Sequence, residues 1–144
     1  MCRFLLIRSQ RGIKPEGLLS DFASMCQESR TPDGGWQGDG WGIAIKYQIL
    51  NSKKQKWISK KYLEPIWKDQ DLFDQFPETN ICAVHARSAG FPKHKGILEY
   101  NQPYIQDELC FVFNGMIRGV TLPRQLEGEI GAQKIFSFLL QEIN

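Results

Sequence analysis

The chain has 144 residues, a formal net charge of +2 and 42% hydrophobic residues. This near-neutral charge, with no basic cluster, argues against a nucleic-acid partner or an anionic membrane surface. The length suits one domain, so a single domain over residues 1–144 is expected. Its apolar runs are far shorter than the roughly 20 residues of a membrane span, and its N-terminus does not look like a secretory signal. These features predict a cytoplasmic protein.

The chain contains four cysteines at positions 2, 26, 82 and 110. They form no C-x-x-C pair, and neither histidine is close in sequence to two of them. Zinc sites and disulfide frameworks of small proteins have characteristic short spacings. The pattern therefore disfavours both, and no metal or other cofactor is expected.

The first half of the chain predicts a strand, a helix and a loop. Cys2–Arg8 is apolar enough for a buried strand. A helix is expected after Pro15, because apolar residues then recur at helical spacing; these are Leu18, Leu19, Phe22, Met25 and Cys26. Thr31–Gly40, rich in Gly and Asp, predicts a loop.

The remaining elements predict a mixed fold. Four more strands are expected, over Trp41–Tyr47, Lys56–Tyr62, Ile81–Arg87 and Glu108–Asn114. The first two should form a hairpin with its turn at Asn51-Ser52. Expected helices are Lys68–Phe76 and Gly131–Ile143. Hairpin-like strands with fewer helices indicate an α+β fold with a largely antiparallel sheet covered by helices. The end at a helix favours a shortened version of a larger domain.

Cys2 is the first candidate for chemistry. Removal of Met1 would leave a thiol next to a free α-amino group, and the amine could accept the thiol proton near neutral pH. By itself, however, a cysteine at the start of a strand is commonly a small apolar residue.

Three further segments carry candidate residues. Gly38–Ala44 has three glycines that allow close backbone approach, or simply a tight turn. His85–Gly90 places Arg87 at a strand end, where it would hold a carboxylate or form a structural ion pair; His85 on the same face could be an ordinary core histidine. Asn114 and Gly115 follow an apolar strand and form either a turn or an oxyanion hole.

The order of these motifs is more specific than any one of them. Cys2-Arg3, Gly38–Ala44, His85-Ala86-Arg87 and a strand ending in Asn114-Gly115 together resemble the class II glutamine amidotransferases. These are N-terminal-nucleophile (Ntn) hydrolases with an αββα sandwich of largely antiparallel sheets. The chain looks closest to their free-standing branch, which includes γ-glutamyl amide hydrolases.

The resemblance implies a role for each matching residue. Cys2 would be the nucleophile, its α-amino group the general base and acid, and Asn114 with Gly115 the oxyanion hole. Arg87 would clamp the substrate α-carboxylate, with His85 and Ser88 in the same substrate-binding segment. The implied substrate is glutamine or a γ-glutamyl compound, and a separate synthase subunit is the expected acceptor of released ammonia.

The sequence departs from the family pattern at the final helix. Gly131 stands where the family usually has the Asp that holds the substrate α-ammonium, and Glu127 or Glu129 could supply that carboxylate instead. The main alternative is therefore a non-catalytic paralogue that keeps the pocket as a binding or scaffolding module. A redox or metal protein has only the number of cysteines in its favour.

Overall fold

A computed structural model describes residues 1–30, 34–48, 55–121 and 124–143. It contains a four-stranded antiparallel sheet of order β1-β4-β2-β3 and an antiparallel hairpin of β5 and β6. The strands are β1 (Arg3–Ile13), β2 (Trp41–Gln48), β3 (Gln55–Tyr62), β4 (Thr79–Ala86), β5 (Tyr104–Gln106) and β6 (Leu109–Phe111). The α-helices are α1 (Glu16–Glu28) and α2 (Gly131–Ile143). Short 3-10 helices are η1 (Ile66–Lys68), η2 (Gln70–Gln75), η3 (Pro92–His94) and η4 (Leu98–Tyr100).

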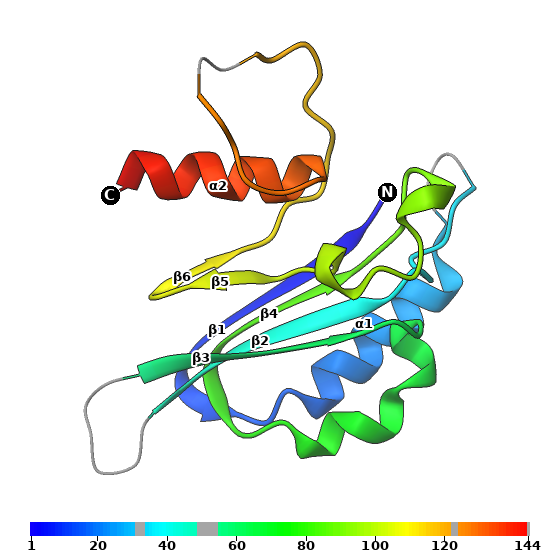
Figure 1. Ribbon diagram of the computed structural model, residues 1–144. Helices are drawn as coiled ribbons and strands as arrows, with labels where there is room; N and C mark the ends of the chain where they lie inside the picture. The colour runs from blue at the N-terminus through cyan, green and yellow to red at the C-terminus, as the bar shows by residue number, and fades with distance from the viewer. Residues whose placement is uncertain (31–33, 49–54, 122–123, 144) are drawn as a thin grey trace.

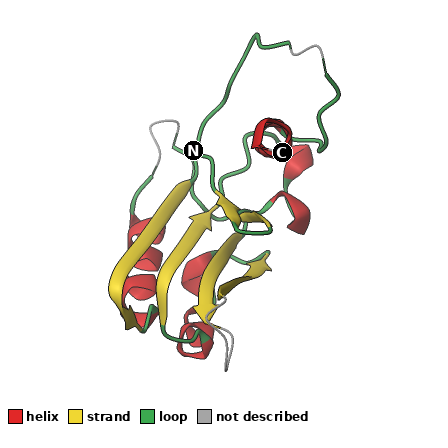
Figure 2. Cartoon of the chain, turned by 90° about the vertical axis from the view of Figure 1, so that its left-hand side faces the viewer, coloured by secondary structure: helices red, strands yellow, loops and turns green. Residues whose placement is uncertain are grey.

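The elements are stacked in layers (Figures 1 and 2). Helix α1 covers one face of the four-stranded sheet, the β5–β6 hairpin lies on the opposite face, and α2 lies on the outer side of the hairpin. An ion pair between Lys46 and Glu108 at 2.7 Å ties the hairpin to β2. On the β1 side of the same sheet face, Phe4 and Leu6 remain 53% and 64% exposed. The hairpin therefore covers this face only in part.

The hydrophobic core lies between α1 and the sheet. Alternate residues of the central strands point toward α1, including Ile43 and Ile45 of β2 and Val84 of β4. From the helix, Leu19 and Phe22 pack against them. This burial, rather than helix propensity, accounts for most of the stability expected of α1.

Trp41 is the largest side chain buried completely in this core. Its indole N–H donates to Asp69 Oδ2 at 2.8 Å, so the buried polar group is satisfied. Its ring stacks on Tyr62 at 4.5 Å and meets Phe73 and Phe76 edge to face. Trp41 therefore joins β2, β3 and the 3-10 segment into one packed unit.

The α+β fold and its antiparallel pairing are confirmed. Trp41 pairs with Tyr62 as the expected hairpin requires, whereas the expected turn at Asn51-Ser52 lies outside the described residues. The final helix also has the expected bounds. In the 31–40 segment, residues 34–40 form no helix or strand, as expected, and residues 31–33 lie outside the description.

Several predicted bounds are wrong. The first strand continues to Ile13, because pairing with β4, irregular after Arg8, resumes where Ile13 lies opposite Thr79. The predicted helix Lys68–Phe76 is replaced by the 3-10 helices η1 and η2. They are separated by Asp69, which has a non-helical backbone (φ −106°, ψ 23°) and accepts the Trp41 indole N–H. In α1, Leu18 and Met25 are 42% and 40% exposed, so they are not core residues.

The strand predicted over Glu108–Asn114 is also too long, since β6 covers only Leu109–Phe111. A side-chain amide takes the place of a strand partner beyond it. The Phe113 N–H donates to Gln102 Oε1 at 2.6 Å, and Gln102 Nε2 donates to the Phe113 carbonyl at 3.1 Å. The strand predicted over Ile81–Arg87 likewise ends one residue early, at Ala86.

Among the described helices, none is long and apolar enough to cross a membrane.

Candidate active site

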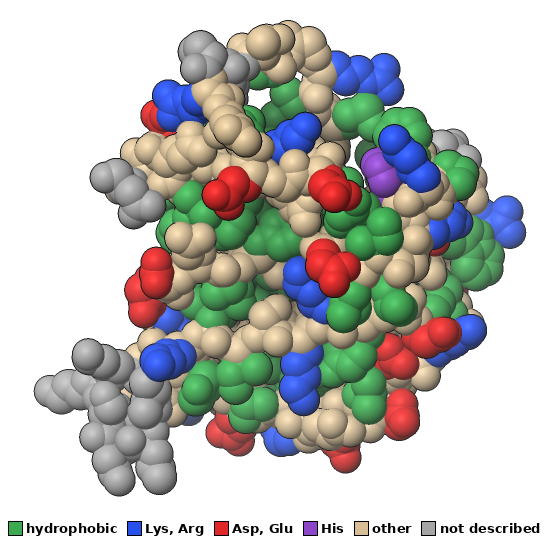
Figure 3. All heavy atoms as spheres, in the orientation of Figure 1, with side chains coloured by type: hydrophobic (Ala, Val, Ile, Leu, Met, Phe, Trp, Pro, Cys, Tyr) green, Lys and Arg blue, Asp and Glu red, His purple; other side chains and the backbone are tan. Residues whose placement is uncertain are grey.

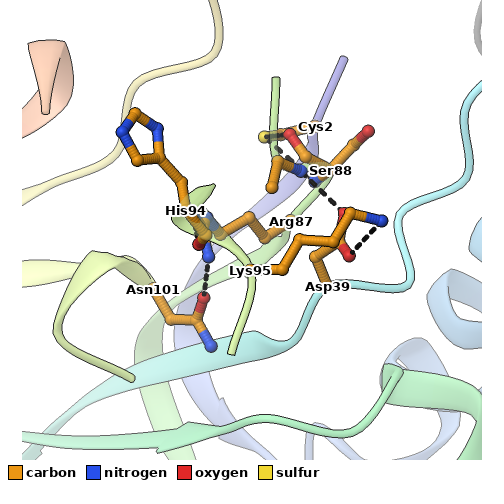
Figure 4. Close-up of polar contacts among 8 residues, drawn as sticks. Cys2, Asp39, Arg87, Ser88, His94, Lys95 and Asn101 are labelled. Atoms are coloured by element: carbon orange, nitrogen blue, oxygen red, sulfur yellow. Dashed lines mark hydrogen bonds and ion pairs between the residues drawn. The ribbon is translucent and has the colours of Figure 1, made fainter. Parts of the chain in front are cut away.

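The Cys2 thiol lies directly before β1, beside the segment that follows β4. Register explains this position, because Arg3 pairs with Ala86 and the preceding residue therefore lies opposite the start of residues 87–89. The Ser88 N–H donates to Cys2 Sγ at 3.4 Å, and Sγ lies 3.6 Å from the Ser88 carbonyl oxygen (Figure 4). Ser88 thus contacts the thiol through its backbone.

The glycine-rich segment holds this backbone in place. Asp39 N–H donates to the Arg87 carbonyl at 3.0 Å, and Arg87 N–H donates to the Gly40 carbonyl at 2.9 Å. The Asp39 carboxylate accepts from the Ala89 N–H at 2.8 Å and pairs with Lys95 at 3.1 Å. Sequence reasoning did not assign Asp39 a role; an acidic residue between two glycines was the available signal.

Close backbone approach at the glycine-rich segment is confirmed. Gly40 has a φ of 99°, and a Cβ there would lie 2.3 Å from Asn101 Nδ2. A Cβ on Gly42 would lie 2.3 Å from the Gln102 carbonyl oxygen. Only glycine leaves room for the 101–103 segment to cross the sheet here. That segment in turn carries Gln102, which holds Phe113 just before Asn114.

Arg87 is only 5% exposed and lies among neutral acceptors. Its Nη2 donates to the His94 carbonyl at 2.7 Å, and Nη1 lies 3.5 Å from Asn101 Oδ1 (Figure 4). The guanidinium also lies 5.5 Å from the centre of the Tyr100 ring. In the described part of the chain, no carboxylate lies within ion-pair distance of it, so the structural ion pair considered above is not formed there. A buried cation without a counter-ion favours binding of an anion.

Asn114 lies beside Cys2, although the two residues are far apart in the sequence. Its side-chain amide donates to the Cys2 carbonyl oxygen at 2.8 Å, across 112 positions of sequence. Gly115 follows it on the surface, where a Cβ would meet the ring of Phe113 at 3.2 Å. Asn114 of the predicted oxyanion hole therefore contacts the backbone of the predicted nucleophile, and Gly115 adjoins it in the sequence.

His85 lies on the same face of the sheet as Arg87, two residues later, but is completely buried. Neither ring nitrogen has a hydrogen-bond partner. Burial, and then the nearby Arg87 charge, lower the pKa of His85 to about 3. The imidazole is consequently neutral at physiological pH. Of the residues predicted to bind substrate, His85 is thus the one that solvent does not reach.

The environment of Cys2 favours the protonated thiol. Burial raises the pKa of Cys2, and the Asp39 charge adds to this rise. The hydrogen bond from Ser88, the chain-terminal charge and Arg87 act in the opposite direction but do not cancel it. A thiol of this kind needs an adjacent base to react near neutral pH. With Met1 in place, the Cys2 nitrogen is part of a peptide bond and cannot act as that base; Met1 is 51% exposed.

A carboxylate is connected to Arg87 through the Tyr100 side chain. The Tyr100 hydroxyl donates to Glu129 Oε2, which raises the pKa of Tyr100, and the same ring faces the Arg87 guanidinium. Of the two acidic residues considered as replacements for an Asp at position 131, Glu129 is therefore linked to Arg87 through one ring. Glu127 instead lines a groove beside α2.

The cysteines are not joined to one another. Cys26 and Cys82 are buried in the core, Cys2 and Cys110 are half-buried, and all four are free thiols. Within the described ranges, no group of three or more His, Cys, Asp or Glu side chains could hold a metal ion.

No protein-family model matches the chain, and no curated protein matches it significantly.

Proposed function

We propose that this protein is a cytoplasmic amidohydrolase that cleaves a γ-glutamyl-type amide through a thioester on Cys2. The proposal rests on the hydrogen bond from the Asn114 amide to the Cys2 carbonyl oxygen. The Ser88 N–H contacts the Cys2 thiol, and the buried Arg87 directly precedes Ser88. A nucleophile, an amide donor and an uncompensated cation suit a substrate with a carboxylate and an amide. The layered antiparallel fold is compatible with an Ntn sandwich, which we propose as its fold.

The proposed reaction begins after Met1 is removed. The α-amino group of Cys2 takes the thiol proton, and the sulfur attacks the amide carbonyl carbon. The Asn114 side chain and the Gly115 N–H donate to the resulting oxyanion. The amine leaves with the proton held by the α-amino group, and water then hydrolyses the thioester to the free acid.

Arg87 is the proposed partner of the substrate α-carboxylate. Its two neutral acceptors, the His94 carbonyl and Asn101 Oδ1, orient the guanidinium without neutralising it. A planar guanidinium binds a carboxylate at two points. We place Ser88 and His85 in the same substrate-binding region, Ser88 through its backbone and His85 beneath it as a neutral ring.

Glu129 is the proposed partner of the substrate α-ammonium, because the Tyr100 ring links it to Arg87. We expect Glu129→Gln to lower kcat/KM for glutamine by roughly 10- to 150-fold, the range for a hydrogen bond to a charged group. Glu127→Gln is the matched control, since it removes an equal charge nearby, and it should change kcat/KM little. The measurement is ammonia release over a range of glutamine concentrations. Equal effects of the two variants would refute the assignment to Glu129.

Labelling with a diazoketone analogue of glutamine tests the proposed function directly. Protein from which Met1 has been removed should gain one adduct in its intact mass, located on Cys2 by peptide mapping. Protein that retains Met1 should react more slowly, at a rate that rises from pH 7 to pH 9. The sign follows from the raised pKa of Cys2, which keeps the thiolate scarce until the pH is high.

The other cysteines provide an internal control. Burial raises the pKa of Cys26 and Cys82 to about 12 and that of Cys110 to about 11, so they should stay unlabelled. Failure to label Cys2 after complete Met1 removal would favour the non-catalytic binding module instead. A labelled protein that releases ammonia would justify a search for a separate synthase subunit as acceptor.

A further inference from the structure

A groove separate from the cysteine site opens between α2 and the strands β3 and β5. Its volume is about 460 Å³, within the range of small-molecule sites. Ser59 and Lys61 line it from the sheet, Tyr104 from the hairpin, and Phe136 from α2. On this face of the molecule, hydrophobic side chains gather beneath α2 with acidic and basic side chains at their margin (Figure 3). Cys2, Arg87 and Asn114 are not among the lining residues.

Two charged residues line the groove, Glu127 and the cation Lys61. Lys61 is half-buried on the sheet face that carries the hairpin, and its ammonium lies 4.7 Å from the centre of the Tyr104 ring. Across the described segments, no carboxylate lies within ion-pair distance of this ammonium. Burial lowers the pKa of Lys61, and the charge of Glu99 opposes this only in part. The ammonium has therefore lost water without forming a direct ion pair.

One wall of the groove, next to Lys61, carries aromatic and apolar side chains. The rings of Tyr104 and Phe136 stack with centres 6.0 Å apart at 28°, and Pro103 and Leu140 extend the surface. Such a wall suits a flat apolar group, and Lys61 at its edge suits a single negative charge.

We infer that this groove binds a small aromatic carboxylate, with its carboxylate on Lys61 and its ring against Tyr104 and Phe136. The site goes beyond the proposed hydrolase chemistry. It uses none of the residues assigned to that reaction, so a test of ligand binding in the groove does not depend on the reactivity of Cys2.

The test is an NMR titration of isotope-labelled protein with 3-phenylpropionate, with 3-phenylpropanamide as the neutral probe of the same shape. We expect saturable shifts at Lys61, Tyr104 and Phe136 with the acid. Lys61→Gln should weaken binding of the acid by about tenfold, which is the low end for a hydrogen bond to a charged group. The same substitution should leave the weaker binding of the amide unchanged, and Lys61→Arg should restore binding of the acid.

Lys60→Gln is the matched control. Lys60 neighbours Lys61 on β3 but points to the other sheet face, where its ammonium lies 5.9 Å from the Phe76 ring. This variant should bind the acid as the parent does. The inference is overturned if shifts map elsewhere, if acid and amide bind equally, or if the Lys60 and Lys61 variants lose affinity alike.

Discussion

Replacing Cys2 with Ala in protein that lacks Met1 should abolish amide hydrolysis, with a fall in kcat/KM on the order of 10⁴-fold or more. The sulfur forms the bond to the substrate in the proposed reaction, and a methyl group cannot replace it. Fold stability should change little, because Cys2 lies outside β1 and makes only weak sulfur contacts with Ser88. The assay is product release from a γ-glutamyl anilide or from glutamine.

Two variants sharpen this experiment. Cys2→Ser keeps a nucleophilic atom and should retain slightly more activity than Cys2→Ala, while Cys110→Ala removes a half-buried thiol elsewhere and should remain active. Hydrolysis at the parental rate by Cys2→Ala would show that Cys2 is not the nucleophile. If the parent is inactive but its Cys2 is labelled, the substrates tested are the wrong ones.

Replacing Trp41 with Ala should lower the free energy of unfolding by about 3–5 kcal/mol. The substitution empties the centre of the core, removes three aromatic contacts and leaves Asp69 Oδ2 without its indole donor. Because domains of this size have only about 5–15 kcal/mol of stability, the variant is expected to lose a large fraction of it. Urea unfolding followed by circular dichroism measures the difference.

Trp36→Ala is the matched control for this loss. Trp36 is 43% exposed and contacts Trp67 edge to face, with Arg30 near its ring. Its removal should cost about 1 kcal/mol or less. Similar losses for the two tryptophans would contradict the central position of Trp41 in the core.

Local patterns predicted much of the fold. The strand-like segments Trp41–Tyr47 and Lys56–Tyr62 predicted the hairpin of β2 and β3, in which Trp41 lies opposite Tyr62. Helical spacing after Gly131 identified α2 with its observed bounds. Glycines at positions 40 and 42 indicated close backbone approach, because a side chain there would collide with a crossing segment. These features depend on neighbouring residues, whose spacing is visible along the chain.

The proximity of the candidate site residues could be proposed from sequence only through their combined order. Cys2 and Asn114 are 112 positions apart, and no periodicity links them. The structure brings them together because β1 pairs with β4 and because Gln102 holds Phe113 beside the sheet. The sequence therefore suggested which residue types matter, while their contact is a property of the tertiary structure.

Other features were decided by tertiary structure alone. The early end of β6 follows from the Gln102 amide, which occupies the backbone groups of Phe113 in place of a strand. Asp39 holds residues 87–89, and Lys61 loses water where Tyr104 of the hairpin lies against its ammonium. A sequence pattern records which side chains prefer burial, but hydrogen bonds and desolvation depend on which distant groups fill the space around each atom.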